Sequence, residues 1–270
     1  MARQGGEIAL DLIEDSSPTL KPDNSVLTQA DTEISLLIRE ELKDMLETGE
    51  HILIDEEEKD YTKVFDQSFL ESASYTWVVD PIDGTRNFSN RIPLYGISIG
   101  LLRDLKPWLG LVYLPSLGEM FFSDGKGSFF VTGAFSGKER RRPVLPVDQP
   151  ISPQSVFYGS DTFFKDYEWD SSLCQMVLPS CAVVHLCWPA IGRGCGYFFK
   201  ANIWDFAGSW PVFLSAGLGL RSLSSGKPLD RIDTRLFMGR GAETWRLREP
   251  YILSSEGNFS RLQAAISSKP

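Results

Sequence analysis

Apolar residues recur at helical spacing along the N-terminal part of the chain and predict two amphipathic helices there. The first covers residues 2–14, and the second follows Thr28 and ends at Gly49. The apolar positions of the second helix lie three or four residues apart: Ile34, Leu37, Ile38, Leu42, Met45 and Leu46. An apolar run over residues 51–54 then predicts a strand. Its end delivers the acidic residues 55–58 to a sheet edge shared with the next strand.

Apolar runs separated by turn sequences predict an antiparallel meander in the middle of the chain. Its strands are expected at residues 95–102, 108–114, 119–123 and 128–132. Residues 138–153 turn basic and proline-rich, so we place a boundary there and divide the chain into halves 1–137 and 138–270. The basic run from Lys138 to Arg142 is expected to be a solvated loop.

The second half mixes both periodicities. Strands are predicted at 156–158 and 197–199, and helices at 182–190 and 203–214.

Composition narrows the protein class. The chain has 270 residues, 42% of them hydrophobic, which is enough for a sizeable core. A net charge of -9 argues against nucleic-acid binding, and it means that an anionic substrate needs local cations. We find neither a signal-peptide pattern at the N-terminus nor an apolar stretch of membrane-spanning length, and we expect a cytoplasmic protein without a membrane partner.

The cysteines and histidines carry no metal or redox motif. Cys174, Cys181, Cys187 and Cys195 lack the short spacings of zinc sites and are expected to be reduced and mostly buried. Of only two histidines, His185 lies in an apolar helical run, where a core histidine is the usual finding.

Two carboxylates stand in one turn after the predicted strand 77–79. The turn reads Asp80-Pro81-Ile82-Asp83-Gly84-Thr85, and a helical turn begins just after it. Such a turn can offer carboxylates to a cation and backbone N–H groups to an anion. The same string also makes an ordinary surface turn.

A third carboxylate, Asp205, opens the predicted helix 203–214 within the sequence Trp-Asp-Phe-Ala-Gly. Its plain interpretation is a helix cap that complements the helix dipole. The small residues Ala207 and Gly208 allow another element to pack closely there.

Together these motifs resemble the inositol monophosphatase-like family of metal-dependent phosphomonoesterases, many of which lithium inhibits. The resemblance rests on residues 80–85 with Asn87-Phe88, residues 204–208 with Ala216-Gly217, Glu56-Glu57, Thr28-x-x-Asp31, and residues 110–115 with Glu119. It implies an α/β protein with a layered αβαβα sugar-phosphatase-like fold. An α+β N-terminal half with an antiparallel sheet and an α/β C-terminal half would enclose the metal site, and the resemblance also implies a homodimer.

The resemblance implies a set of metal ligands made only of oxygen atoms. These are the side chains of Glu56, Asp80, Asp83 and Asp205 and the carbonyl of Ile82. Hard oxygen ligands favour Mg²⁺, with Mn²⁺ as a substitute, and two or three ions are expected.

The implied reaction is hydrolysis of a small phosphorylated metabolite, by in-line attack of metal-activated water. Thr85, supported by Asp31, would orient and deprotonate the water, with Glu56 as the alternative general base. Backbone N–H groups of Gly84 and Thr85 would hold the phosphate.

The chain departs from its relatives where the substrate should bind. Inositol-hydrolysing members carry a Gly-Ser/Thr-x-Ala patch, which here reads Pro179-Ser180-Cys181-Ala182. They also carry a glutamate seven residues before the aspartate of the Trp-Asp motif, a position that Phe198 occupies in this chain. The candidate substrate-binding residues are therefore Asp83, Ser180, Cys181, Phe198 and Lys200, although Phe198 suits core packing equally well.

The alternative substrates are 3'-phosphoadenosine 5'-phosphate, fructose 1,6-bisphosphate and histidinol phosphate. A member that binds a phosphorylated ligand without hydrolysing it is the alternative function.

Overall fold

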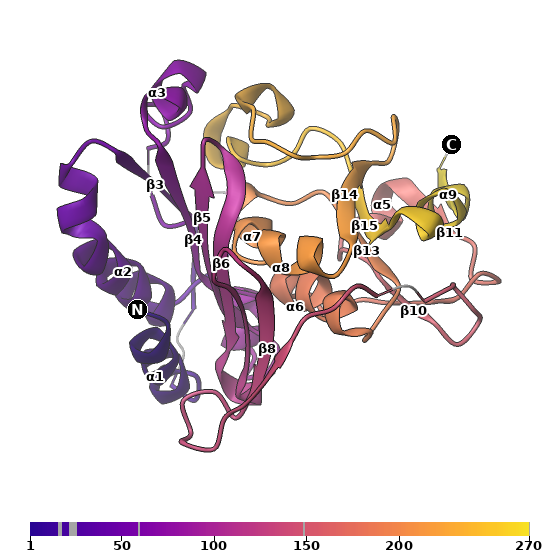
Figure 1. Cartoon of the computed structure of the whole chain (residues 1–270), viewed down its shortest axis with the longest axis horizontal. Helices are drawn as coiled ribbons and strands as arrows, with labels where there is room; N and C mark the ends of the chain where they lie inside the picture. Colours follow the sequence, from indigo (N-terminus) through magenta and orange to yellow (C-terminus); the bar gives the residue numbers. More distant parts are fainter. Residues whose placement is uncertain (16–17, 22–25, 59, 148, 270) are drawn as a thin grey trace.

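Helices and sheets alternate in five layers (Figure 1). The computed structural model describes residues 1–15, 18–21, 26–58, 60–147 and 149–269. From one side to the other, the layers are two N-terminal helices, a seven-stranded sheet, a central group of helices, a five-stranded sheet and an outer helical layer. This is the layer order that the sequence implies.

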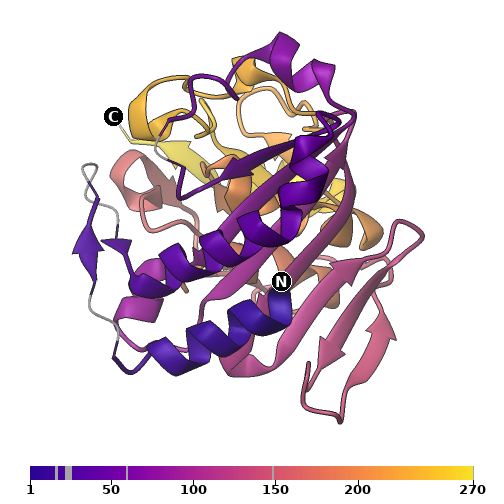
Figure 2. The ribbon, with the colours of Figure 1, turned by 90° about the vertical axis from the view of Figure 1, so that its left-hand side faces the viewer.

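Two antiparallel helices, side by side, cover the outer face of the large sheet (Figure 2). The helices of this half are α1 (Ala2–Leu12), α2 (Gln29–Glu47), α3 (Gln67–Ser72) and α4 (Thr85–Ser89). Thr28 caps α2 and forms a capping box with Asp31. Ile34, Ile38 and Leu42 lie on its buried face, as the helical spacing predicts.

The large sheet has the order β3-β4-β5-β6-β7-β8-β9. Its strands are β3 (His51–Asp55), β4 (Tyr75–Asp83), β5 (Gly96–Arg103), β6 (Lys106–Leu114), β7 (Glu119–Ser123), β8 (Ser128–Thr132) and β9 (Arg140–Pro143). β3 and β4 are parallel, and the other neighbours are antiparallel. The predicted meander is confirmed, and Asp55 lies opposite Val79, so the acidic cluster meets the Asp80 strand at one edge.

The run Lys138–Arg142 is solvent-exposed, as predicted, but the prediction of a loop is wrong, because most of the run belongs to the edge strand β9. The Arg141 guanidinium lies 3.4 Å from the centre of the Phe129 ring and 4.9 Å from that of Phe122. The aromatic face of the sheet therefore gives this strand a partner that charge counting cannot reveal. Charged side chains on an edge strand also discourage pairing with another chain.

The smaller sheet has the order β12-β10-β13-β15-β14. Its strands are β10 (Val156–Tyr158), β12 (Gln175–Val177), β13 (Gly196–Phe199), β14 (Leu218–Ser222) and β15 (Tyr251–Ser255). β12, β10 and β13 are parallel, whereas β15 pairs antiparallel with β13 and β14. The chain passes from the large sheet to this one between β9 and β10, so β9 belongs to the large sheet although it follows the predicted division at residue 137.

The remaining elements are short. They are β1 (Thr19–Leu20) paired with β2 (Val26–Leu27), β11 (Tyr167–Trp169) paired with β16 (Ile266–Ser268), the helices α5 (Phe163–Asp166) and α9 (Glu256–Ala264), and the 3-10 helices η1 (Pro115–Leu117), η2 (Pro189–Ile191), η3 (Thr234–Leu236) and η4 (Gly241–Glu243).

The central layer consists of α6 (Ala182–Cys187), α7 (Ile203–Ala207) and α8 (Trp210–Ser215). The two long helices predicted here are each interrupted. The first continues as η2 because Pro189 cannot donate the helical hydrogen bond. The second breaks at Gly208 and Ser209.

Pro211, near the start of α8, lacks the N–H that would continue the helix across the second break, and Gly208 permits close packing there. A Cβ atom at this position would lie 2.5 Å from Ser98 Oγ and 2.8 Å from the Leu111 carbonyl oxygen, so only glycine permits the contact with β5 and β6. The predicted close approach at this motif is confirmed. It seats α7 against the large sheet and brings Asp205 to the end of β4.

Candidate active site

A bulge at the end of β4 aims two aspartates at one point. The pairing of β4 with β5 shifts between Asp80 and Asp83, so the regular alternation of side chains is broken there. Gly84 follows with φ +83, a conformation that favours glycine, and α4 starts at Thr85. The predicted turn begins later than expected, because β4 continues through both aspartates to Asp83 and the chain turns only at Gly84.

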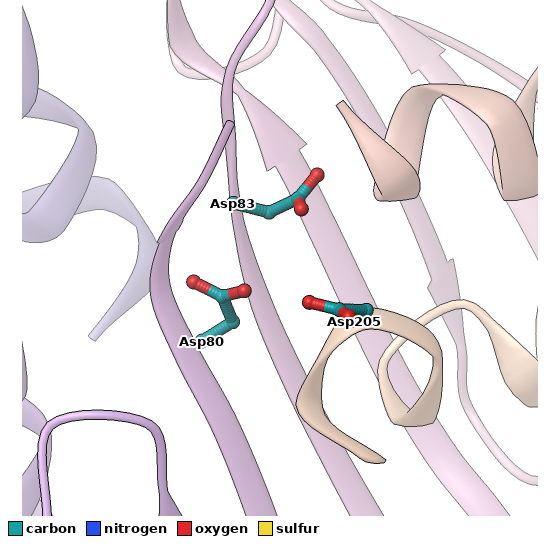
Figure 3. A group of neighbouring side chains, drawn as sticks. All are labelled: Asp80, Asp83 and Asp205. Atoms are coloured by element: carbon teal, nitrogen blue, oxygen red, sulfur yellow. The ribbon is translucent and has the colours of Figure 1, made fainter. Parts of the chain in front are cut away.

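Asp205 joins these two aspartates from the other half of the chain (Figure 3). One ligand oxygen from each of Asp80, Asp83 and Asp205 lies within 4.8 Å of the others. Asp205 also accepts a hydrogen bond of 2.7 Å from the Asn202 N–H, as the first-turn carboxylate of α7. Both interpretations of this residue hold, because one carboxylate caps the helix and faces the cluster.

Asp80 and Asp83 are buried, Asp205 is half-buried, and the three carboxylates repel each other. Asp80 is 1% exposed, and its Oδ1 atom has no hydrogen-bond partner within the described part of the chain. Burial, followed by the charges of neighbouring carboxylates, raises the pKa of Asp80 and of Asp205 well above the usual range. Burial also raises the pKa of Asp83. A hard divalent cation fits this oxygen cluster, because it would satisfy the orphaned oxygen and offset the repulsion.

Glu56 extends the cluster from the end of β3. Its N–H donates to the Val79 carbonyl at 3.1 Å, which continues the parallel pairing and places Glu56 beside Asp80. Lys21 Nζ lies 3.4 Å from Glu56 and 2.8 Å from Glu57. Burial raises the pKa of Glu56 to about 8, although the Lys21 charge opposes this shift. Lys21 stands 35 residues away and carries no local motif, so the sequence gives no signal for this contact.

Thr85 and Asp31 meet as the resemblance implies. Thr85 Oγ1 lies 3.2 Å from Asp31 Oδ1 and 2.8 Å from the Ile82 carbonyl oxygen. Asp31 is 1% exposed, and burial raises its pKa. Its other oxygen accepts the Thr28 N–H at 2.8 Å, so the capping box holds the carboxylate in place for Thr85.

Comparison with known proteins identifies the family. The model of the inositol monophosphatase family matches residues 2–254. The chain belongs to the inositol monophosphatase family. Two curated relatives and one solved structure illustrate its place in this family of phosphatases, and the predicted membership and fold class are confirmed.

The first relative is the fructose-1,6-bisphosphatase/inositol-1-monophosphatase of Aquifex aeolicus, 27% identical over 54% of this chain and 56% of its own length. The match therefore spans only about half of that relative. Inositol monophosphatase 1 of Homo sapiens is 26% identical over 87% of this chain and 85% of its own length. The structure of an IMPase/NADP phosphatase complexed with Mg²⁺ and phosphate superimposes with a TM-score of 0.74, at 17% identity and covering 97% and 90% of the two chains.

In this member of the inositol monophosphatase family, the aspartate cluster opens into a cavity of about 370 Å³. Glu56, Asp83, Gly84, Thr85 and Asp205 line one part of it. Ser180, Cys181 and Lys200 line the other part, so these three candidate substrate residues face the same cavity as the aspartate cluster. Five further residues line the cavity that the sequence does not predict: Ser160, Asp161, Thr162, Arg86 and Arg246.

The prediction that Phe198 contacts the substrate is wrong, because its side chain does not line the cavity. It is 2% exposed and packs edge-on against Phe163, with ring centres 4.7 Å apart. Side chains alternate between the two faces of a strand, so Tyr197 and Phe199 face the central helices while Phe198 faces the outer layer.

Cys181 holds Asp83 in position. Its thiol lies 3.0 Å from Asp83 Oδ2, and the Val183 N–H donates to the same oxygen at 2.8 Å. All four cysteines are free, and Cys195 is the one that is not fully buried.

Within the described residues, no helix is long and apolar enough to cross a membrane.

His185 is a core residue, as predicted. It is 1% exposed and its ring stacks on Tyr158, with centres 5.3 Å apart. Burial lowers its pKa to about 3, so the imidazole is neutral.

Proposed function

We propose that the protein hydrolyses a small phosphorylated metabolite in a Mg²⁺-dependent reaction. The observation that carries the proposal is the cluster of three carboxylates from two halves of the chain, two of them buried and one half-buried, with ligand oxygens within 4.8 Å of each other. Asp80, Asp83, Asp205, Glu56 and the Ile82 carbonyl would hold two or three metal ions. Bound Mg²⁺ would neutralise phosphate oxygens, lower the pKa of water and stabilise the leaving alkoxide.

Thr85 and Asp31 would position and deprotonate the attacking water. The threonine proton can pass to Asp31 at 3.2 Å while the hydroxyl oxygen accepts a proton from water. The raised pKa of Asp31 suits this role, because a more basic carboxylate takes up the proton more readily. Glu56 is the alternative base, but its carboxylate already contacts Lys21.

The phosphate would bind above α4. Gly84 and Thr85 both line the cavity, and the left-handed conformation of Gly84 starts the helix beneath it. Their backbone N–H groups are the proposed phosphate contacts. We also expect the protein to be cytoplasmic and to form a homodimer. Gel filtration with light scattering can check the dimer.

The test compares the wild type with Asp80→Asn and with Asp44→Asn, a matched change on the exposed side of α2. Phosphate release is measured from p-nitrophenyl phosphate, inositol 1-phosphate, fructose 1,6-bisphosphate, 3'-phosphoadenosine 5'-phosphate and histidinol phosphate, with Mg²⁺ or with EDTA. We expect Mg²⁺-dependent release that falls at least about a hundredfold in Asp80→Asn and is unchanged in Asp44→Asn. A folded wild type that releases no phosphate from any compound would instead support the non-hydrolysing alternative.

A further inference from the structure

Three parallel strands deliver their loops to one wall of the cavity. β12, β10 and β13 are neighbours in the smaller sheet, so the loops that follow them lie along the same edge. Ser180 follows β12, Ser160 and Thr162 follow β10, and Lys200 follows β13 directly. All of them line the cavity. Ligands of α/β sheets bind beyond the carboxyl ends of such strands, so this wall should contact the part of the substrate that extends from the aspartate cluster.

The charges on this wall are not balanced. Arg86 lies 3.4 Å from Asp161, and Arg246 lies 2.9 Å from Glu243, so each arginine has a carboxylate partner. Lys200 makes no ion pair or hydrogen bond with any residue that the structure describes, although its side chain is half-buried. An ammonium group that lines a cavity without a carboxylate partner can pair with an anionic group of a ligand.

We propose that Lys200 selects substrates whose leaving group carries a second anionic group, either a phosphate or a carboxylate. The inference rests on the proposed function, because the reacting phosphate is placed at the aspartate cluster. The hydroxyls of Ser160 and Thr162, 3.3 Å apart, lie on the same wall and can donate to the second anion. A protein of net charge -9 repels a doubly anionic ligand, so a local cation has a large effect on its binding.

The size of the cavity agrees with such a ligand. At about 370 Å³ it lies near the lower end of the range for small-molecule pockets, which suits a metabolite of sugar or nucleoside size.

Pairs of substrates that differ only in the second anion test this proposal. They are fructose 1,6-bisphosphate with fructose 1-phosphate, 3'-phosphoadenosine 5'-phosphate with adenosine 3'-monophosphate, and 3-phosphoglycerate with glycerol 1-phosphate. The last pair separates a carboxylate from a phosphate. The proteins are the wild type, Lys200→Gln, Lys200→Arg and, as the matched control, Lys165→Gln, which changes an exposed lysine that does not line the cavity.

We expect the wild type to favour the doubly anionic member of at least one pair by about tenfold or more in kcat/KM, mainly through KM. Lys200→Gln should remove that preference by lowering kcat/KM much more for the doubly anionic partner than for the singly charged one, Lys200→Arg should keep part of it, and Lys165→Gln should keep all of it. A wild type without preference in any pair, or an equal loss on both members in Lys200→Gln, would overturn the inference.

A binding measurement separates this inference from the proposed function. Isothermal titration of the dephosphorylated products fructose 6-phosphate, adenosine 5'-monophosphate and glycerate reports on the second anion alone. Weaker binding of one of them to Lys200→Gln than to the wild type supports the subsite even if p-nitrophenyl phosphate is not hydrolysed. Equal binding of every product to both proteins, or no binding at all, contradicts it.

Discussion

Replacing Asp205 by asparagine should stabilise the metal-free protein and reduce its stabilisation by Mg²⁺. The change removes one of three carboxylates whose oxygens lie within 4.8 Å of each other. It keeps an oxygen that can accept the Asn202 N–H, so the cap of α7 is retained. Two ionised carboxylates about 5 Å apart repel by about 3 kcal/mol at an effective dielectric constant near 20. Partial protonation lowers this figure, so we expect a gain of about 1 kcal/mol in EDTA.

The wild type should gain more stability from Mg²⁺ than Asp205→Asn does. A ligand that binds only the folded state at about one hundred times its Kd adds about 2.7 kcal/mol to the free energy of unfolding. For a chain of this size, that corresponds to a rise in Tm of about 5 to 10 °C. In Asp205→Asn the rise should be less than half as large at the same Mg²⁺ concentration, because a ligand is lost.

Thermal melts followed by circular dichroism at pH 7.5 check both signs. They compare EDTA with increasing MgCl₂ at constant ionic strength, with Asp44→Asn as the matched control. The prediction is wrong if Asp205→Asn has a lower Tm than the wild type in EDTA and if Mg²⁺ raises the Tm of both proteins by the same amount. A wild-type melt that stays constant up to tens of millimolar Mg²⁺ would count equally against it.

Three further predictions concern single side chains. Thr85→Val should lower kcat by about a hundredfold or more with Tm unchanged, whereas Thr85→Ser should keep most of the activity; equal rates for the two variants would exclude a role for the hydroxyl. Cys181→Ala removes a donor to the buried Asp83 carboxylate and should lower kcat and Mg²⁺ affinity together. Cys181→Ser keeps the donor and should restore both. Identical Mg²⁺ titrations of the two variants would contradict this. The pKa of Glu56 is raised from 4.5 to about 8, so the folded state binds a proton more tightly than the unfolded state. This contribution to stability is complete below pH 4.5 and is lost as pH rises through 8. Urea unfolding in EDTA between pH 5.5 and 8.5 should show a decrease in the free energy of unfolding, and saturating Mg²⁺ should make that decrease smaller. A free energy of unfolding that rises with pH in EDTA would contradict the prediction.

Local chemistry made part of the carboxylate motif predictable. The glycine after Asp83 indicates the turn into α4, whereas the register shift between Asp80 and Asp83 and the parallel pairing of β3 with β4 depend on the neighbouring strands. The capping box that positions Asp31 is likewise a short-range pattern.

Contacts between distant segments were not predictable in the same way. Counting seven residues back from Asp205 selects Phe198, but strand alternation turns that side chain into the core and leaves Lys200, after the strand end, on the cavity wall. The contact of Lys21 with Glu56 depends on tertiary packing alone. The close approach of Gly208 to the main chain of β6 depends on tertiary packing, which no helical period can report.

The central claim is that the three-aspartate cluster is the metal site of a phosphatase. Initial rates of phosphate release as a function of Mg²⁺ concentration, for the wild type and Asp205→Asn, test it most directly. The account predicts a saturable Mg²⁺ dependence in the wild type, and a rate at least about a hundredfold lower in Asp205→Asn at every Mg²⁺ concentration. A rate that is independent of Mg²⁺, or the same in both proteins, would contradict it.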